Sequence, residues 1–225
     1  MPTAQLRSYQ NPFYPEGTPA NQALHFASTA AQLINATINW PGFRPLVLGR
    51  NYSYRTREVP GGRIAQTSPQ EIYEIIANGK EMHGGANGVV DLHVSIIKIT
   101  KPNTVGRVAH PGATLIETDI DFFDKWMRGP KAGSLAGHWL HEWMHCAGFY
   151  HKRVSTSVRN RDVPYSLGYI LRDVWSDKVF QSSLIADGIE FDDTSFDADD
   201  LVHDCECFST IDKDDTDGAE APGGA

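Results

Sequence analysis

Eleven residues, from His141 to His151, read H-E-W-M-H-C-A-G-F-Y-H and combine three histidines, one glutamate and one glycine at fixed spacings. His141 and His145 are four residues apart, so on an α-helix they lie one above the other on the same face. Gly148 can adopt the left-handed conformation that ends a helix and turns the chain, which lets His151 approach from outside the helix. The spacing therefore predicts a helix, a sharp turn and three imidazoles that converge on one point.

The predicted helix has one apolar face and one face that carries the histidines and Glu142. The apolar residues are Ala136, Trp139, Leu140, Trp143 and Ala147. We therefore expect the helix to bury one side and to present its ligands on the other. His138 lies on the ligand face one turn before His141, but three ligands from one rigid helix would span more length than one ion can reach. His138 is therefore expected either to support the ligands from beside them or to face solvent.

His141, His145 and His151 are candidate ligands of a zinc ion, and three protein ligands leave a fourth position open for water. An ion held in this way lowers the pKa of its bound water from 15.7 toward about 7. Glu142, beside the first ligand, is placed to take the proton of that water as a general base and to pass it to a leaving amine. The pattern therefore favours hydrolysis, with Glu142 as the first candidate catalytic residue.

Composition and charge exclude several classes of function. The 225 residues suit one domain, or one domain split by a cleft, and carry a formal net charge of -8. Most of the excess acid lies in the last third, so no basic stripe is available for a nucleic acid. No apolar run approaches the roughly 20 residues of a membrane span, and the amino terminus lacks the layout of a signal peptide. Localisation and oligomeric state are not predicted.

Hydrophobic periodicity and turn residues predict an α/β (α+β) fold with a mixed sheet. The expected helices are Asn21 to Asn39, Gln70 to Asn78, the ligand helix after Gly129-Pro130, and Ile170 to Phe180. The expected strands are Leu46 to Tyr54, Val89 to Thr100, Val105 to Ala109 and Thr114 to Phe122, with a turn over Val163 to Tyr169. We expect residues 1–20 to form an N-terminal extension, residues 21–200 the catalytic domain, and residues 201–225 an acidic, Gly/Ala-rich, disordered tail.

Two weaker features concern the cysteines and a second metal. Of Cys146, Cys205 and Cys207, the last two are too close to pair readily with each other, so at most one bridge, from Cys146, is expected. Cys146 itself is more readily explained as a small residue packed beside the site than as a reactive thiol. Asp212 to Gly218 resembles a calcium loop loosely but has no closing Glu, so a solvated acidic tail is favoured over calcium binding.

The signature H141-E142-x-x-H145-x-x-G148-x-x-H151 resembles the elongated zinc motif of the metzincin metallopeptidases. The preceding stretch, Gly106 to Phe123, is similar to the family's edge strand, bulge and following strand. The resemblance implies a twisted mixed sheet with helices in an upper lobe, a smaller irregular lower lobe, and one zinc ion in the cleft between them. It also implies that a protein or peptide substrate lies extended along Val105 to Ala109, where main-chain hydrogen bonds can hold it.

The chain departs from the metzincin pattern in three places. No methionine follows Met144, and Leu167 stands where the family's methionine turn would place one. Tyr169, two residues on, is then the candidate for a catalytic tyrosine that stabilises the transition state. Lys152, after the third histidine, matches no subfamily, and no cysteine-switch segment precedes the domain.

Three functions remain after this comparison. The first is a zinc endopeptidase. The second is a non-catalytic zinc-binding interaction domain, and a retained Glu142 argues against it because a structural site needs no base. The third is a zinc-dependent hydrolase of a non-peptide amide, which would use the same chemistry at the metal.

Overall fold

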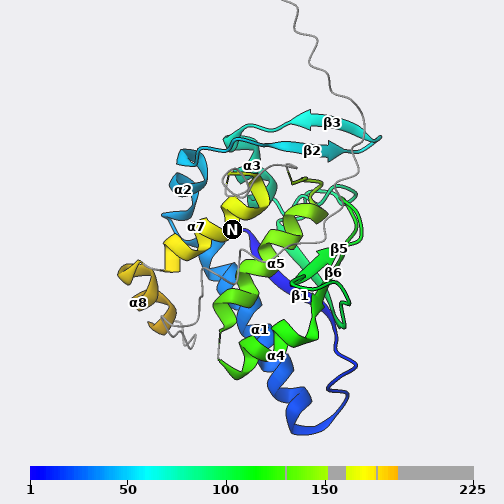
Figure 1. The fold of residues 1–225 in the computed structure, drawn as a ribbon. Coiled ribbons are helices and arrows are strands. Elements are labelled where there is room, and N and C mark those ends of the chain that lie inside the picture. Colours follow the sequence, from blue (N-terminus) through cyan, green and yellow to red (C-terminus); the bar gives the residue numbers. More distant parts are fainter. Residues whose placement is uncertain (130, 152–160, 176, 187–225) are drawn as a thin grey trace, which may run out of the picture.

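A four-stranded mixed sheet forms one side of the fold in the computed structural model, which describes residues 1–129, 131–151, 161–175 and 177–186 (Figure 1). Its strand order is β1-β4-β6-β5. The parallel strands are β1 (Thr3–Gln10), β4 (Val89–Ile97) and β6 (Leu115–Asp119), and β5 (Gly106–Val108) runs antiparallel at the edge. The mixed sheet and the strand expected at Val105 to Ala109 are thus confirmed. The tail 201–225, with Cys205, Cys207 and the calcium-loop stretch, lies outside the described residues.

The first strand belongs to a segment that was expected to be an N-terminal extension. Residues 3–10 pair in parallel with β4, from Thr3 opposite Val89 to Gln10 opposite Ser95, with an irregularity between Leu6 and Ser8. The strand is an edge strand with few apolar residues, and its ladder partner lies far along the sequence. Its own pattern therefore gave little indication of a strand.

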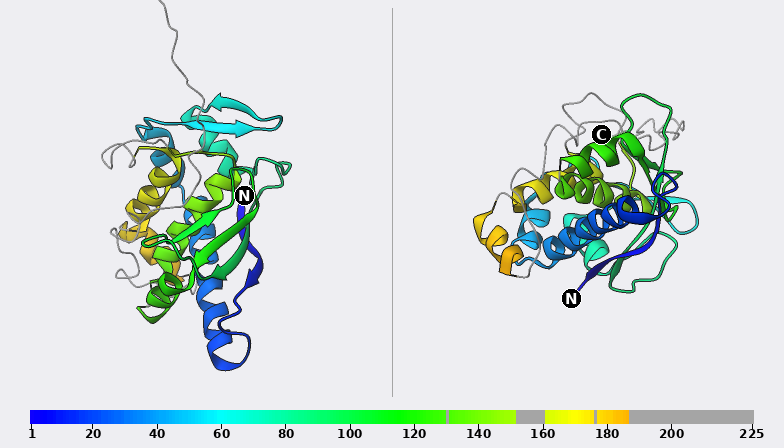
Figure 2. Two further views of the ribbon diagram at one scale, coloured as in Figure 1. Left: turned by 45° about the vertical axis from the view of Figure 1, so that its right-hand side comes forward. Right: turned by 90° about the horizontal axis from the view of Figure 1, so that it is seen from below.

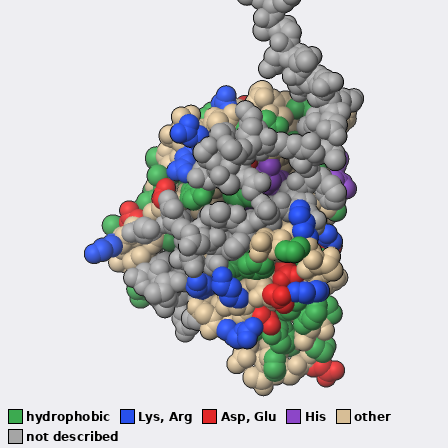
Figure 3. Space-filling view, viewed as in Figure 1, with side chains coloured by type: hydrophobic (Ala, Val, Ile, Leu, Met, Phe, Trp, Pro, Cys, Tyr) green, Lys and Arg blue, Asp and Glu red, His purple; other side chains and the backbone are tan. Residues whose placement is uncertain are grey.

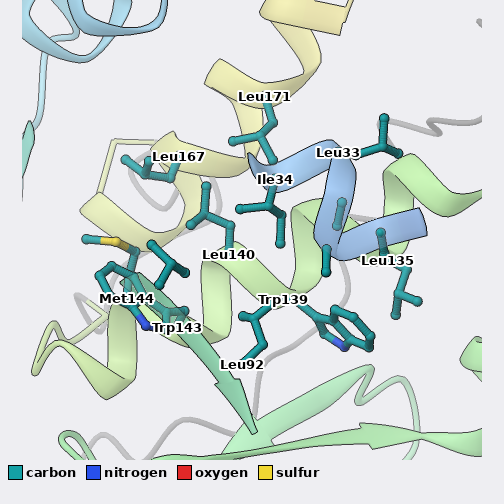
Figure 4. Close-up of a cluster of buried hydrophobic side chains, with 14 of the residues drawn as sticks. Leu33, Ile34, Leu92, Leu135, Trp139, Leu140, Trp143, Met144, Leu167 and Leu171 are labelled. Carbon is teal, nitrogen blue, oxygen red and sulfur yellow. The ribbon is translucent and has the colours of Figure 1, made fainter. Parts of the chain in front are cut away.

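Helices α1 (Gly17–Asn39) and α5 (Ala132–Cys146) pack against the sheet and against each other, and α7 (Val163–Trp175) packs on α5 (Figure 2). The shared core contains Leu33, Ile34, Leu92, Leu135, Trp139, Leu140, Trp143, Met144, Leu167 and Leu171 (Figure 4). Every residue of α5 is buried. The expectation that α5 would bury only one side is therefore wrong, because neighbouring elements cover its polar face as well.

The region between α1 and the next helix differs most from the sequence prediction. The first four residues of the strand predicted from Leu46 to Tyr54 instead belong to α2 (Phe43–Gly49), and the rest form no helix. The buried residues Phe43 and Val47 of α2 are four apart, as a helix requires. A hairpin of β2 (Thr56–Val59) and β3 (Arg63–Gln66) follows, and the sequence analysis missed it. Its turn is Pro60-Gly61-Gly62, with both glycines at positive φ.

Helix-start residues explain the elements around the other strands. Ser68 caps α3 (Pro69–Ala77) through two reciprocal hydrogen bonds with Glu71. The bounds of α3 are close to those of the predicted helix, Gln70 to Asn78. Strand β6 ends at Asp119 rather than at Phe122, because the Asp119 side chain accepts from the Asp121 N–H and begins α4 (Ile120–Arg128). The predicted strand therefore included the first residues of a helix that the sequence analysis had not recognised.

The segment Val163 to Tyr169 is the first half of α7 and not a turn, so the methionine-turn alignment does not describe it. Asp162 accepts a hydrogen bond from the Tyr165 N–H, as a helix cap does. Pro164 falls in the first helical turn, where its missing N–H costs nothing. Leu167 is fully buried in the core where α7 packs on α5. Helix α8 (Lys178–Ala186) follows as a separate element.

Surface charges are mixed rather than segregated. On the face drawn in Figure 3, the described Lys and Arg side chains lie among Asp and Glu. Ion pairs such as Arg7–Asp91 and Arg107–Glu117 contribute to this mixing. Among the described residues, no helix combines the length and apolar character that a membrane crossing needs.

Candidate metal centre

The turn at the end of α5 has the geometry that the sequence predicted. Gly148 has a φ of 94°, and the N–H of Phe149 bonds to the Met144 carbonyl at 3.0 Å. A Cβ at position 148 would lie 2.4 Å from the Glu58 carbonyl oxygen. Glycine is therefore needed twice, for the backbone angle and for the close approach of β2.

Strand β2 and the residues before it hold the chain on both sides of the third histidine. The Glu58 N–H donates to the Gly148 carbonyl at 2.8 Å, and the Tyr150 N–H donates to the Thr56 carbonyl at 3.2 Å. Further back, the Ser53 N–H donates to the Arg161 carbonyl at 2.9 Å. Residues 53–58 therefore hold in place both the segment that leads to His151 and the segment that leads into α7.

Three imidazole nitrogens converge at this place. His151 Nε2 lies 3.2 Å from His141 Nε2 and 3.1 Å from His145 Nε2. The potential ligand atoms of the three residues all lie within 4.8 Å of one another. Zn–N bonds of about 2.0–2.1 Å in a regular tetrahedron separate ligand nitrogens by about 3.3–3.4 Å. The three histidines are thus close enough to bind one metal ion, as the spacing predicted.

Hydrogen bonds on the outer side of the rings set the tautomers of two ligands. His145 Nδ1 lies 2.6 Å from the Phe149 carbonyl oxygen, which can only accept, so Nδ1 carries the proton. His151 Nδ1 lies 2.8 Å from Asp162 Oδ2, and the carboxylate accepts in the same way. In the neutral form of both rings, which metal binding requires, the two Nε2 atoms present lone pairs at a separation of 3.1 Å. Two acceptors this close repel each other unless a cation lies between them, so the arrangement fits a metal ion.

Burial keeps the ligands in the form that a metal requires. Desolvation, with a smaller contribution from the neighbouring histidines, holds the pKa of His141 and of His145 well below the ordinary value. Neutral imidazoles coordinate metals, whereas imidazolium ions do not. The His151 side chain is 12% exposed, so this ligand lies at the more open side of the site.

Glu142 and His138 lie together on the same face of α5. The Glu142 side chain is 1% exposed, and burial raises its pKa well above the ordinary value. His138 Nδ1 is 3.6 Å from Glu142 Oε1, and His138 Nε2 is 3.2 Å from the Thr118 hydroxyl. Burial lowers the pKa of His138 to about 3, so this ring is neutral. His138 therefore occupies the supporting position that was expected, beside Glu142 and not among the three converging nitrogens.

The tyrosine that contacts the histidines is Tyr165. Its ring centroid lies 4.6 Å from that of His141 and 4.7 Å from that of His151. Tyr169, the predicted catalytic tyrosine, is one helical turn further on, with its ring 5.7 Å from the Arg50 guanidinium carbon. The sequence favoured Tyr169 only through the methionine-turn alignment, which does not describe this segment. Its catalytic role stays a prediction.

Asp162 and Tyr165 are the site residues that the sequence analysis missed. Asp162 is fully buried, and it joins the third ligand to the first turn of α7. The available signal was the order Asp162-Val163-Pro164, a cap residue followed by proline in the first turn of a helix. Cys146, by contrast, is buried and free, and burial raises the pKa of its thiol well above the ordinary value. This favours a packing role for Cys146.

Replacing Asp162 with Asn should weaken metal binding roughly 10- to 100-fold, the range for partners that orient a ligand. The carboxylate accepts two hydrogen bonds, from His151 Nδ1 and from the Tyr165 N–H. An amide has one oxygen, so its NH2 group would face one of these two donors. Competition titration with a chromophoric zinc chelator measures the change in affinity.

The matched control is Asp173→Asn, which changes a carboxylate within α7. Asp173 is partly exposed and lies 3.6 Å from Arg50. Metal affinity should be unchanged in this variant. Equal affinities in the wild type and in Asp162→Asn would show that Asp162 does not orient His151.

Comparison with profiles of known protein families, with curated proteins and with solved structures gave no significant match. The geometry of the site is therefore the basis for assigning a function.

Proposed function

We propose that this protein is a zinc endopeptidase of metzincin type, which hydrolyses peptide bonds of protein substrates with Glu142 as the general base. The observation that carries the proposal is the convergence of three Nε2 atoms, with the protons of His145 and His151 held on the far side of each ring. A glutamate directly after the first of these histidines is the arrangement that metal-assisted hydrolysis uses. His141, His145 and His151 would hold the ion.

Each residue then has a defined task. A zinc ion bound here supplies a water that is nucleophilic near neutral pH and a Lewis acid for the substrate carbonyl. Glu142 accepts the proton of the attacking water at its carboxylate and donates it to the amine nitrogen that leaves. Asp162 and the Phe149 carbonyl keep the Nδ1 protons of His151 and His145 in place, so that both Nε2 atoms remain acceptors.

Strand β5 supports a peptide as the substrate. It is one of the two edge strands of the sheet and pairs only with β6 among the described strands. It also lies close to α5, since a Cβ on Gly106 would be 2.4 Å from His138 Nε2. An extended peptide can add to such an edge by main-chain hydrogen bonds, which would bring its backbone past the ligand helix.

Metal removal tests the proposal. The purified chain should contain about one zinc ion per molecule and should cleave denatured casein, because the three imidazoles suit one ion. Treatment with 1,10-phenanthroline should abolish cleavage, and added zinc should restore it. Cleavage that persists after complete removal of zinc would overturn the proposal.

A non-catalytic zinc-binding domain is the second candidate, and the burial of the site favours it. The exposed fractions are 4% for His141, 1% for Glu142 and 1% for His145. A purely structural ion needs no access for substrate. This candidate predicts stoichiometric zinc, loss of stability on chelation, and no cleavage of any protein substrate.

A further inference from the structure

A cavity of about 460 Å³ lies beside the candidate metal centre. Its lining comes from four segments that are distant in sequence: Glu58 of β2, Met82 and His83 before β4, residues 109–111 between β5 and β6, and Tyr150. Two hydrogen bonds attach these walls to the end of the ligand helix. The Gly112 N–H donates to the His145 carbonyl at 2.8 Å, and the Met82 N–H donates to the Cys146 carbonyl at 3.0 Å.

The cavity is close to the expected path of a substrate. Ala109 follows β5 directly, and Tyr150 immediately precedes His151. An extended peptide that paired with β5 would reach the rim of the cavity as it passed the end of the strand. A side chain of such a peptide could therefore enter the cavity while the backbone stayed near the histidines.

The polar groups of the cavity favour a positive charge. The Tyr150 hydroxyl donates a hydrogen bond to Glu58 Oε2. No Lys or Arg of the described residues forms an ion pair with Glu58. Glu58 Oε1 and the lone pairs of the Tyr150 oxygen thus remain as acceptors for a ligand. A guanidinium or ammonium group offers the matching donors.

The remaining walls suit the stem of a long side chain and not a second metal ion. Met82, Ala109 and Pro111 provide apolar surface against which the methylene groups of Arg or Lys can pack. Among the described residues, the histidines of the metal centre are the only group placed to hold an ion, so His83, His110 and Glu58 do not form one. An acidic side chain would be repelled by Glu58.

We infer that this cavity is a specificity pocket that binds an Arg or Lys side chain of the substrate through Glu58 and Tyr150. The inference rests on the proposed peptidase function and adds the substrate preference of that site. It predicts that one position near the cleaved bond carries a basic residue.

The test uses the zinc-loaded full chain and peptides based on one cleaved site of casein. Each residue flanking the cleaved bond is replaced in turn by Arg, Gln or Glu, and kcat/KM is measured for every peptide. At one position Arg should exceed Gln by about tenfold, the effect expected for one hydrogen-bonded charge pair. Glu58→Gln should remove this advantage, and Glu58→Arg should favour the Glu peptide instead.

Glu74→Gln, which changes an exposed carboxylate of α3, is the matched control and should keep the Arg preference. Zinc content is measured for each variant, because Glu58 is bonded to Tyr150, which directly precedes the candidate ligand His151. Zinc-dependent cleavage with no preference for Arg at any position would overturn the pocket and leave the peptidase intact. No cleavage of any peptide by the zinc-loaded wild type would overturn both.

Discussion

Glu142→Gln should lower kcat for casein cleavage by roughly a hundred- to ten-thousand-fold, the contribution of a general acid and base, while zinc remains bound. Glutamine has nearly the same shape as glutamate but cannot accept the proton of the attacking water. The fold should tolerate the change, because Glu142 is buried and its raised pKa reflects the cost of burying its charge. Initial rates and zinc content, measured on the same preparation, separate loss of chemistry from loss of metal.

Glu16→Gln is the control for this variant, since Glu16 is exposed ahead of α1 and its side chain makes no capping bond there. Its activity should equal that of the wild type. Undiminished cleavage by Glu142→Gln would remove Glu142 from the mechanism. Stoichiometric zinc with no cleavage by the wild type or by Glu142→Gln would support the non-catalytic candidate.

The second large effect is expected for His145→Ala, which should lose zinc after dialysis against buffer without metal. Two remaining imidazoles hold an ion far more weakly than three, and the substitution also removes the bond from His145 Nδ1 to the Phe149 carbonyl. Zinc content is measured directly. A thermal shift on adding zinc gives a second readout, because an ion that binds only the native state raises Tm.

His25→Ala is the matched control, since His25 is exposed on α1 and lies outside the converging group. It should retain zinc and show the wild-type thermal shift. Full stoichiometric zinc in His145→Ala would contradict the assignment of the three ligands. A variant that lacks zinc but keeps its helical content would show that the loss is local to the site.

The part of the site that sequence could predict is the part built from neighbouring residues. Helical spacing relates His141 to His145, and the turn at Gly148 brings in His151 within eleven residues. The order of the strands Val89 to Thr100 and Val105 to Ala109 was also readable, because β-branched residues gather between turn residues. These features need little information from the rest of the chain.

The features that sequence analysis missed depend on distant partners. Strand β1 has few apolar residues and is recognisable only beside β4, more than eighty residues later. Strand β2 is four residues long and has a turn signal but no apolar alternation that would reveal its second partner near Gly148. Tyr165 was assigned to a turn, because the hydrophobic pattern loses its regularity after His151, whereas Asp162 and Pro164 begin a helix there.

The position of β2 has a consequence for how the protein folds. Hydrogen bonds from residues 53–58 fix the segments on both sides of His151, and 92 residues separate Glu58 from its partner Tyr150. Contacts between such distant residues form slowly, because the loop between them must close first. His141 and His145 can come together as soon as α5 forms, but His151 joins them only after β2 has docked. Metal uptake should therefore follow the slow phase of refolding, and the rate of zinc binding would report when the last long-range contact has formed.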